Sequence, residues 1–342
     1  MLRELVSSAT SGVDRVVAAT MIRRHLRAAS GPAIRADEEW PNLPAIMASY
    51  DRPEHYADAR VFFGDPSPAR PILARVKKLA DGDVLDAVWP SGEPFHRGVA
   101  AAYLAHPSNR SAGARLFLHR ERPGAAVILV HGYLGGRYAV EERIWNARRL
   151  YDRGFDVALA TLPFHGVRAD ARPPLFPAAD PRMTNEGIRQ TIGDLRALMG
   201  FFHERGTTRV GAMGMSLGGY AVALLATVEP TLAFAVPVVP LADLTDFARG
   251  HLPAQVDAFG LARARAHRVI SPLARRPVIA PSSVLVIGAS ADEIAPIAHA
   301  EALAAHFGAQ LETIHGGHVL QLGRAAAFRK IDQFLSTRWS DA

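Results

Sequence analysis

Cysteine is absent from this chain of 342 residues. Without cysteine the protein has no disulfide, no thiolate ligand for a metal ion and no cysteine nucleophile. The composition therefore fits a reducing compartment, and any covalent catalysis must use another side chain. Apolar residues make up 49% of the chain, which is enough to bury the core of a globular protein.

Lysine is the second residue type that is scarce. Three of the 39 basic residues are lysines (Lys77, Lys78 and Lys330), and the arginines that make up the rest are scattered along the chain. A protein that binds nucleic acid more often shows a dense basic run or a recognisable binding module. Because neither is present, we interpret the formal charge of +6 as a compositional bias and expect no nucleic-acid partner.

Long apolar runs are also lacking. Charged residues interrupt the first segment at Arg3, Glu4 and Asp14, and the apolar stretch 16–22 is too short for a convincing export signal. No run approaches the roughly 20 apolar residues that a membrane-spanning helix requires. We therefore expect a soluble, cytoplasmic protein.

The first 30 residues carry apolar side chains at helical spacing and predict an N-terminal helix. Its basic end (Arg23, Arg24, His25, Arg27) allows peripheral contact with an anionic membrane surface. We favour the alternative, a helix that packs against the rest of the protein. Residues 31–83 are rich in proline and loop signals, so we treat 1–83 as a partly helical N-terminal extension.

From residue 84 onward, apolar segments with the length of strands alternate with helical segments. The unbroken apolar run 126–130 is typical of a strand that is buried on both faces. Such alternation predicts an α/β fold with a doubly wound, mostly parallel sheet over residues 84–342. The expected strands are 84–89, 99–105, 115–119, 126–130, 156–161, 209–213, 233–239, 283–287 and 310–314; the expected helices are 140–152, 185–203, 217–228, 296–307 and 319–337.

Two long stretches interrupt this alternation. Residues 163–183 are rich in proline, and residues 241–281 are rich in arginine. Connections of this length in a compact domain are usually functional lids or inserted caps. We expect both stretches to be lid segments, with a peripheral elaboration away from the site as the alternative.

The strongest chemical signal is the sequence GMSLGG at residues 214–219, between an expected strand and an expected helix. A serine hydroxyl attacks a carbonyl only if it is exposed and a base can take its proton. A sharp strand-to-helix turn exposes Ser216 and crowds the backbone, which explains Gly214 and Gly218 on either side. At the start of the helix, the N–H of Leu217 can point at a developing oxyanion. The alternative is a tight turn with an inert serine.

A general base has to accompany the serine. His318 follows the last expected strand in the run Gly316-Gly317-His318. Catalytic groups gather at the carboxyl ends of strands in open α/β sheets, which favours His318 as the base. His315, at the strand end itself, is the nearest competitor.

An acid is needed to orient that base. Asp292 follows the expected strand 283–287, where its carboxylate can accept the second N–H of His318 and stabilise the imidazolium. Glu293 is the alternative next to it, and Asp243 and Asp246 are further alternatives. A purely structural role for Asp292, capping the helix that follows, is compatible with the catalytic one.

The order Ser216, Asp292, His318 along the chain is the order of α/β-hydrolases and differs from that of two other common serine-protease folds. On these motifs, residues 126–334 resemble an α/β-hydrolase core. The sequence HGYLGG at 131–136 is similar to the His-Gly oxyanion loop of that family. This resemblance implies an α/β-hydrolase fold, with the backbone N–H of Tyr133 beside that of Leu217 in an oxyanion hole.

Three further residues are candidates for the substrate pocket. The sequence PFHG at 163–166 is similar to a loop that borders the site in many α/β-hydrolases, so His165 lines the pocket or has a packing role. Tyr220 belongs to the run SLGGY, which resembles the prolyl-oligopeptidase and dienelactone-hydrolase branches. Leu134 lies in the oxyanion loop itself.

Together these features predict a serine hydrolase that cleaves a small carboxylic ester through an acyl-enzyme. No cofactor and no metal ion is expected, since no pair of histidines at helical spacing stands out. A peptidase, a thioesterase or an acyltransferase with the same three residues remains open. A non-catalytic binding protein on the same scaffold is the alternative from another class.

Overall fold

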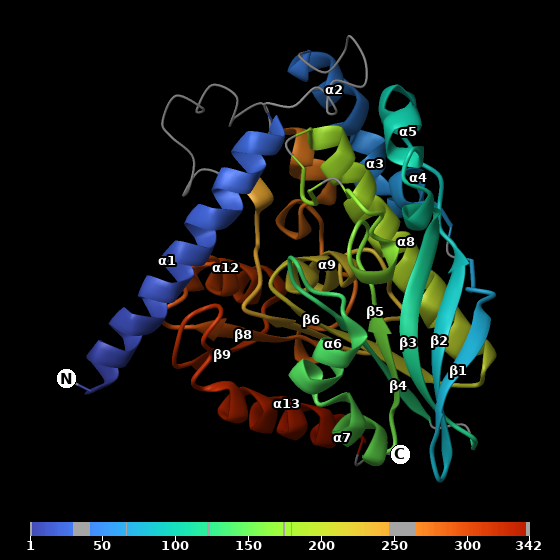
Figure 1. The fold of residues 1–342 in the computed structure, drawn as a ribbon, viewed down its shortest axis with the longest axis vertical. Helices are drawn as coiled ribbons and strands as arrows, with labels where there is room; N and C mark the ends of the chain where they lie inside the picture. The colour runs from blue at the N-terminus through green and yellow to red at the C-terminus, as the bar shows by residue number, and fades with distance from the viewer. Residues whose placement is uncertain are drawn as a thin grey trace.

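A nine-stranded sheet runs through the molecule (Figure 1). The computed structural model describes residues 2–29, 42–65, 67–121, 124–173, 175–178, 180–245 and 265–339. In spatial order the strands are β1 (Ile72–Lys78), β2 (Gly82–Pro90), β3 (Ser111–His119), β5 (Asp156–Ala160), β4 (Ala125–Val130), β6 (Arg209–Met215), β7 (Ala235–Val238), β8 (Leu285–Ala289) and β9 (Gln310–Ile314). Neighbours from β1 to β5 pair antiparallel, and those from β5 to β9 pair parallel. The expected mostly parallel α/β sheet is confirmed.

Helices cover both faces of this sheet. One face carries α6 (Tyr138–Trp145), α7 (Ala147–Asp152) and α13 (Arg324–Trp339), and the other carries α8 (Pro181–Glu204), α9 (Leu217–Leu225) and α12 (Ile297–Phe307) (Figure 1). The remaining α-helices described are α1 (Leu2–Ala29), α2 (Leu43–Tyr50), α3 (Pro53–Ala57), α4 (Ala59–Phe63) and α5 (Arg97–Leu104). The expected doubly wound arrangement follows from the placement of helices on both faces.

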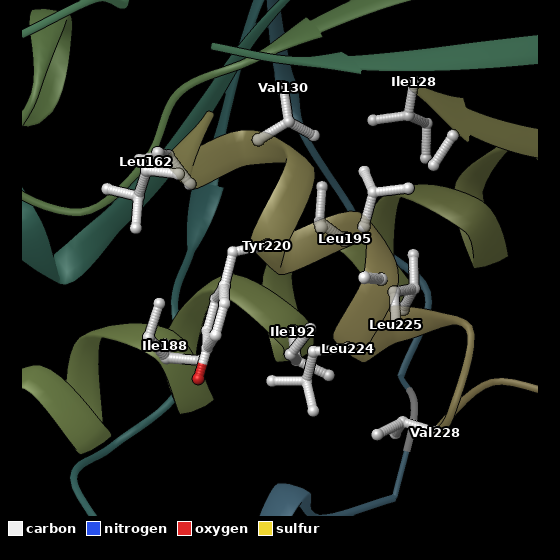
Figure 2. Packing of buried hydrophobic residues seen from close by; sticks show 14 of the residues in the cluster. Ile128, Val130, Leu162, Ile188, Ile192, Leu195, Tyr220, Leu224, Leu225 and Val228 are labelled. Atoms are coloured by element: carbon white, nitrogen blue, oxygen red, sulfur yellow. The ribbon is translucent and has the colours of Figure 1, made fainter. Parts of the chain in front are cut away.

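The central strand β4 shows how the sequence divides the core in two. Side chains alternate across a strand, so Ala126, Ile128 and Val130 pack under α8 and α9, whereas Val127 and Leu129 pack under α6, α7 and α13. Figure 2 shows part of the first cluster, with Ile128 and Val130 close to side chains of α8 and α9. Full burial of each large apolar side chain contributes about 1.5–3 kcal/mol, which explains why the central strand is apolar on both faces.

Residues 99–105, expected as a strand, are helical instead. They belong to α5, where the buried Val99 and Tyr103 are four positions apart and therefore share one face of the helix. Three alanines lie between them and favour the helix, and the side chain of His96 accepts the N–H of Gly98 at its start. The prediction of a strand here was wrong because a short apolar run has no decisive period.

Two other elements differ from expectation: strand β1 was not expected, and the last helix begins later than expected. Strand β1 lies in a region where the sequence resolved no element, since all of its residues are exposed at the edge of the sheet and carry no burial pattern. The last helix begins at Arg324 and not at residue 319. The intervening residues form a turn in which the N–H of Gly317 donates to Leu320 O and the N–H of Gly323 donates to His315 O. This turn leaves His318 outside the helix.

The region before the sheet packs on α8. Ile46, Tyr50 and Phe62 belong to the same buried cluster as the side chains of α8, and the hydroxyl of Tyr50 donates to Glu186 Oε1 over 2.8 Å. The division of the chain at residue 83 stays a prediction. So does the lid role of 163–183 and of 241–281, of which residues 246–264 lie outside the described part. Among the described helices, none combines the length and the apolar character of a membrane span.

Candidate active site

Four loops meet at the carboxyl ends of the parallel strands. The loop 131–136 follows β4, Ser216 follows β6, Asp292 follows β8, and His318 follows β9. Since β4, β6, β7, β8 and β9 are neighbours in the sheet and run in the same direction, their carboxyl ends lie along one edge. This edge is where open α/β sheets place their ligands.

Ser216 occupies a strained turn between β6 and α9. Its φ of 56° lies in the left-handed region, which is rare for a residue other than glycine and is held by the surrounding structure. The N–H of Ser216 donates to Val238 O over 2.9 Å, which ties the turn to the neighbouring strand. A Cβ on Gly214 would collide with Gly218 O, and a Cβ on Gly218 would collide with Val130 O. The glycines two positions to either side are therefore required by close backbone approach.

The imidazole of His318 lies between Ser216 and Asp292. The Oγ–H of Ser216 donates to His318 Nε2 over 2.8 Å, and the Nδ1–H of His318 donates to Asp292 Oδ2 over 2.7 Å. A carboxylate only accepts hydrogen bonds, so Asp292 requires the proton on Nδ1 and leaves the lone pair of Nε2 facing the serine. The structure thus brings together the three residues that the sequence singled out.

The second oxygen of Asp292 is also occupied. Its Oδ1 accepts the N–H of Ile294 over 2.9 Å and the N–H of Ala295 over 2.7 Å. Asp292 is 7% exposed, so these two donors and His318 supply the hydrogen bonds that a buried carboxylate needs. Asp292 therefore fixes the turn that precedes α12, whose N-cap is Pro296 without a side-chain cap, so the expected capping of that helix is not observed.

The alternative acids and base lie elsewhere. Glu293 forms an ion pair with Arg15 over 3.0 Å at the protein surface, and Asp243 accepts the N–H of Thr245 over 2.6 Å. Asp246 lies outside the described residues. Among the described residues, the imidazole that contacts Ser216 is that of His318, whereas His315 directly follows β9 and has a buried Nε2.

A second histidine supports the loop that follows β4. The N–H of Leu162 donates to His131 Nε2 over 3.0 Å, so the proton is on Nδ1, which donates to Gly132 O over 2.7 Å. Burial, with smaller contributions from the charges of His165 and Arg168, lowers the pKa of His131 to about 3. The imidazole of His131 is therefore uncharged, and its two hydrogen bonds fix the backbone just before Tyr133. The resemblance alone did not predict this role.

The three pocket candidates lie in different surroundings. Leu134 is 56% exposed with a φ of 62°, at the tip of the loop after β4. The ring of His165 is buried 6.1 Å from that of Tyr133, and its Nδ1–H donates to Pro163 O over 2.8 Å. Tyr220 points into the core between α8 and α9, where its hydroxyl donates to Ile270 O over 2.8 Å (Figure 2). Leu134 therefore lies at the surface and His165 beside Tyr133, whereas the side chain of Tyr220 lies in the core. A pocket role for Leu134 and His165 stays a prediction.

Nothing in the sequence motifs indicated that Asp14 contacts the site. It is fully buried and accepts the backbone N–H of His318 over 2.6 Å. In the sequence it counted only as a charge that interrupts an apolar segment. Its spacing from Thr10 and Ala18, which are buried on the same face of α1, was the available signal.

No metal centre accompanies these residues in the described part of the chain, where no group of three or more histidine, aspartate or glutamate side chains is arranged to hold an ion. The groups that the described hydrogen bonds bring together are a serine hydroxyl, an imidazole and a carboxylate.

Comparisons with known proteins support the fold. The model of the prolyl oligopeptidase family matches residues 189–315, which include Ser216 and Asp292 and end just before His318. An uncharacterized protein of Mycobacterium tuberculosis is 28% identical over 250 residues, which cover 68% of this chain and 59% of that protein. This chain thus spans about three fifths of the length of the curated relatives it matches.

Two solved structures share the architecture at low sequence identity. Acetyl xylan esterase 1 from Thermoanaerobacterium aligns with a TM-score of 0.56 and 14% identity over 88% of this chain and 94% of its own. An acetyl xylan esterase from Paenibacillus aligns with a TM-score of 0.55 and 15% identity over 86% and 94%. By its strand order and these likenesses, the chain has the α/β-hydrolase fold.

Proposed function

We propose that this protein is a serine hydrolase that cleaves a carboxylic ester through an acyl-enzyme. The observation that carries the proposal is the continuous hydrogen-bonded line from Ser216 through His318 to Asp292. A nucleophile within reach of a base that is itself oriented by a third group is the signature of covalent catalysis. The strained turn that holds Ser216 adds to it, because such strain concentrates at functional sites.

In the first half-reaction, Ser216 Oγ attacks the ester carbonyl while His318 Nε2 takes the hydroxyl proton. The oxyanion that forms is held by the backbone N–H groups of Tyr133 and Leu217. When the tetrahedral intermediate collapses, the C–O bond to the alcohol breaks and His318 returns the proton to the leaving alcohol.

Water completes the cycle in the second half-reaction. His318 Nε2 takes a proton from the water, whose oxygen attacks the acyl carbonyl. The bond to Ser216 Oγ then breaks, the proton returns to that oxygen, and the carboxylic acid leaves. Asp292 keeps its charge throughout and stabilises the imidazolium that forms twice in each turnover.

Esters are the first substrates to test, and peptides are the second. Both solved structures named above are acetyl xylan esterases, whereas the matching family model is that of prolyl oligopeptidases. The same three residues serve either bond, so the choice depends on the pocket.

The decisive experiment is turnover of p-nitrophenyl esters from acetyl to palmitoyl by the wild-type protein and by Ser216→Ala. We expect the variant to lose on the order of 10⁶-fold in kcat. Ser290→Ala, a change at an exposed serine in the loop after β8, is the matched control and should retain activity. Peptidyl p-nitroanilides assayed in parallel separate an esterase from a peptidase.

Two results would contradict the proposal. Equal turnover by Ser216→Ala would show that another group is the nucleophile. A folded wild-type protein that neither turns over these substrates nor reacts with a fluorophosphonate probe would favour a binding protein on the hydrolase scaffold.

A further inference from the structure

Helix α1 lies against the two loops that carry the proposed base and acid. It runs past α12 and beside the end of the sheet formed by β8 and β9 (Figure 1). Its buried residues Thr10, Asp14 and Ala18 are spaced by four, so they form one stripe along the helix, with the buried Ser11 beside it. This stripe is polar at its centre, which is unusual for a helix that packs by its apolar face alone.

Asp14 accepts three backbone hydrogen bonds from these loops. Its Oδ2 accepts the N–H of His318 over 2.6 Å and that of Glu293 over 3.3 Å, and its Oδ1 accepts the N–H of Val319 over 3.0 Å. Burial of a carboxylate is unfavourable unless such donors compensate for the lost water. One side chain of α1 thus joins the base loop to the acid loop, across about 300 residues of sequence.

A second polar contact of α1 reaches the same acid loop. The Oγ–H of Ser11 donates to Ala291 O over 3.1 Å, next to Asp292 in the chain. Arg15 adds an ion pair with Glu293, but its side chain is 71% exposed, and exposed pairs contribute little to stability. The buried contacts of Ser11 and Asp14 therefore dominate the anchoring.

The glycine pair before His318 fits this arrangement. Gly316 has a φ of 117°, so its backbone conformation accounts for the first glycine. At Gly317, an added Cβ would lie 2.5 Å from Asp14 Oδ2 and 3.0 Å from Asp14 Cγ. The second glycine therefore makes room for the carboxylate of α1. Two successive glycines leave the backbone free to move unless it is held from outside.

We propose that Asp14 is a positioning residue, which holds the main chain at His318 and Glu293 so that the imidazole stays aligned between Ser216 and Asp292. This inference rests on the proposed hydrolase function of that site. It assigns a positioning role to the N-terminal helix through Asp14, whose described contacts are with the main chain of the two loops.

Asp14→Asn is the primary test, because it keeps the size of the side chain but turns one acceptor oxygen into a donor that faces backbone N–H groups. We expect kcat for an ester to fall about 10²-fold, since misplacement of a catalytic group by about 1 Å has an effect of this size. KM should change far less, because the hydrogen bonds of Asp14 are with the main chain of the two loops. Val16→Ala, at a 68% exposed position of the same helix, is the matched control and should match the wild type.

Gly317→Ala tests the same contact from the other side and leaves α1 unchanged, so it also serves if Asp14→Asn does not fold. It should lower kcat in the same way. Because both changes break one contact, the double variant should lose little more than the worse single variant. Losses that multiply, or a wild-type kcat in Asp14→Asn, would overturn the proposal.

Hydrogen–deuterium exchange of residues 315–323 provides a readout that does not need turnover. We expect faster exchange at His318 and Val319 in Asp14→Asn than in wild type, with exchange in β4 unchanged. If the wild-type protein proved inactive, the hydrolase proposal would fail while this measurement still tested the anchor. Unchanged exchange at both residues would refute the anchoring role itself.

Discussion

At the scale of single residues, the hydrogen bonds of Asp292 predict how Asp292→Asn affects turnover. In Asp292→Asn the side-chain oxygen stays with the N–H groups of Ile294 and Ala295, because an amide nitrogen cannot accept them. The amide NH₂ then faces His318 Nδ1 and forces the proton onto Nε2, which can no longer take the proton of Ser216. We expect kcat to fall about 10⁴-fold, with little loss of stability because the two hydrogen bonds from Ile294 and Ala295 are kept.

Kinetics of Asp292→Asn beside Glu293→Gln check this prediction. The glutamate change removes an exposed ion pair with Arg15 and should leave turnover within about twofold of wild type, as exposed pairs contribute little. Near-wild-type turnover of Asp292→Asn together with a large loss in Glu293→Gln would reverse our assignment of the acid.

His131 predicts a dependence of stability on pH. Its pKa is lowered by burial to about 3, while the unfolded chain has an ordinary histidine value near 6.5. Between these values the unfolded chain binds a proton that the folded protein does not, so the free energy of unfolding decreases as pH falls through this window. From pH 7 to pH 5 this residue alone should remove about 2 kcal/mol.

The measurement is urea unfolding at pH 7 and pH 5 for the wild type and for His131→Gln. The variant should be less stable at both pH values, because it loses the hydrogen bonds of the His131 ring with Gly132 and Leu162. Its stability should also depend less on pH. Parallel stability curves for the two proteins would show that His131 is not held neutral in the fold.

At the scale of elements, two glycines of α8 are expected to respond in opposite ways to replacement by alanine. Gly187 faces the buried ring of Phe176, which a Cβ would overlap, whereas a Cβ at Gly193 would meet nothing within 4 Å. We expect Gly193→Ala to stabilise the protein by about 0.5–1 kcal/mol through helix propensity. Gly187→Ala should destabilise it by about 1–3 kcal/mol, because a packed core resists added volume.

Chemical denaturation of the two alanine variants decides this. The pair controls for composition, since both carry the same change in the same helix. Stabilisation by both would mean that the ring of Phe176 moves aside freely, and it would weaken the view that α8 is tightly packed against this segment.

At the scale of the whole molecule, the packing of Phe62 predicts cooperative unfolding. Its ring is fully buried and lies 6.0 Å from that of Tyr50 and 5.4 Å from that of Phe95, within the cluster shared with α8 and α9. We expect Phe62→Ala to lower the free energy of unfolding by about 3–5 kcal/mol. Val61→Ala, at a neighbouring position that is 46% exposed, should have a small effect.

Far-UV circular dichroism and tryptophan fluorescence, recorded in the same titration, test the cooperativity. Of the four tryptophans, Trp89 lies in the same cluster as Phe62 and Trp145 lies on the opposite face of the sheet, so the emission follows both halves of the core. Both probes should shift together in Phe62→Ala. A separate early transition that leaves the fluorescence unchanged would show that residues 42–65 unfold on their own.

The sequence alone predicted the α/β fold and singled out Ser216, Asp292 and His318 in their order along the chain. Buried parallel strands read as unbroken apolar runs, and a nucleophile turn needs glycines at fixed offsets, so β4, β6 and Ser216 have local signals. Helix α5 was misread and β1 was missed, because a short apolar run and a fully exposed edge strand carry no decisive period.

Only the tertiary structure decided between neighbours in the sequence. His318 and not His315 contacts Ser216, and Asp292 and not Glu293 contacts His318. These choices depend on how the loops after β8 and β9 are placed by strand pairing. The contact of Asp14 with His318 joins residues about 300 positions apart, and no local pattern encodes such a pair. Local periodicity and steric need are properties of the chain, whereas the alignment of the site arises only when distant segments pack together.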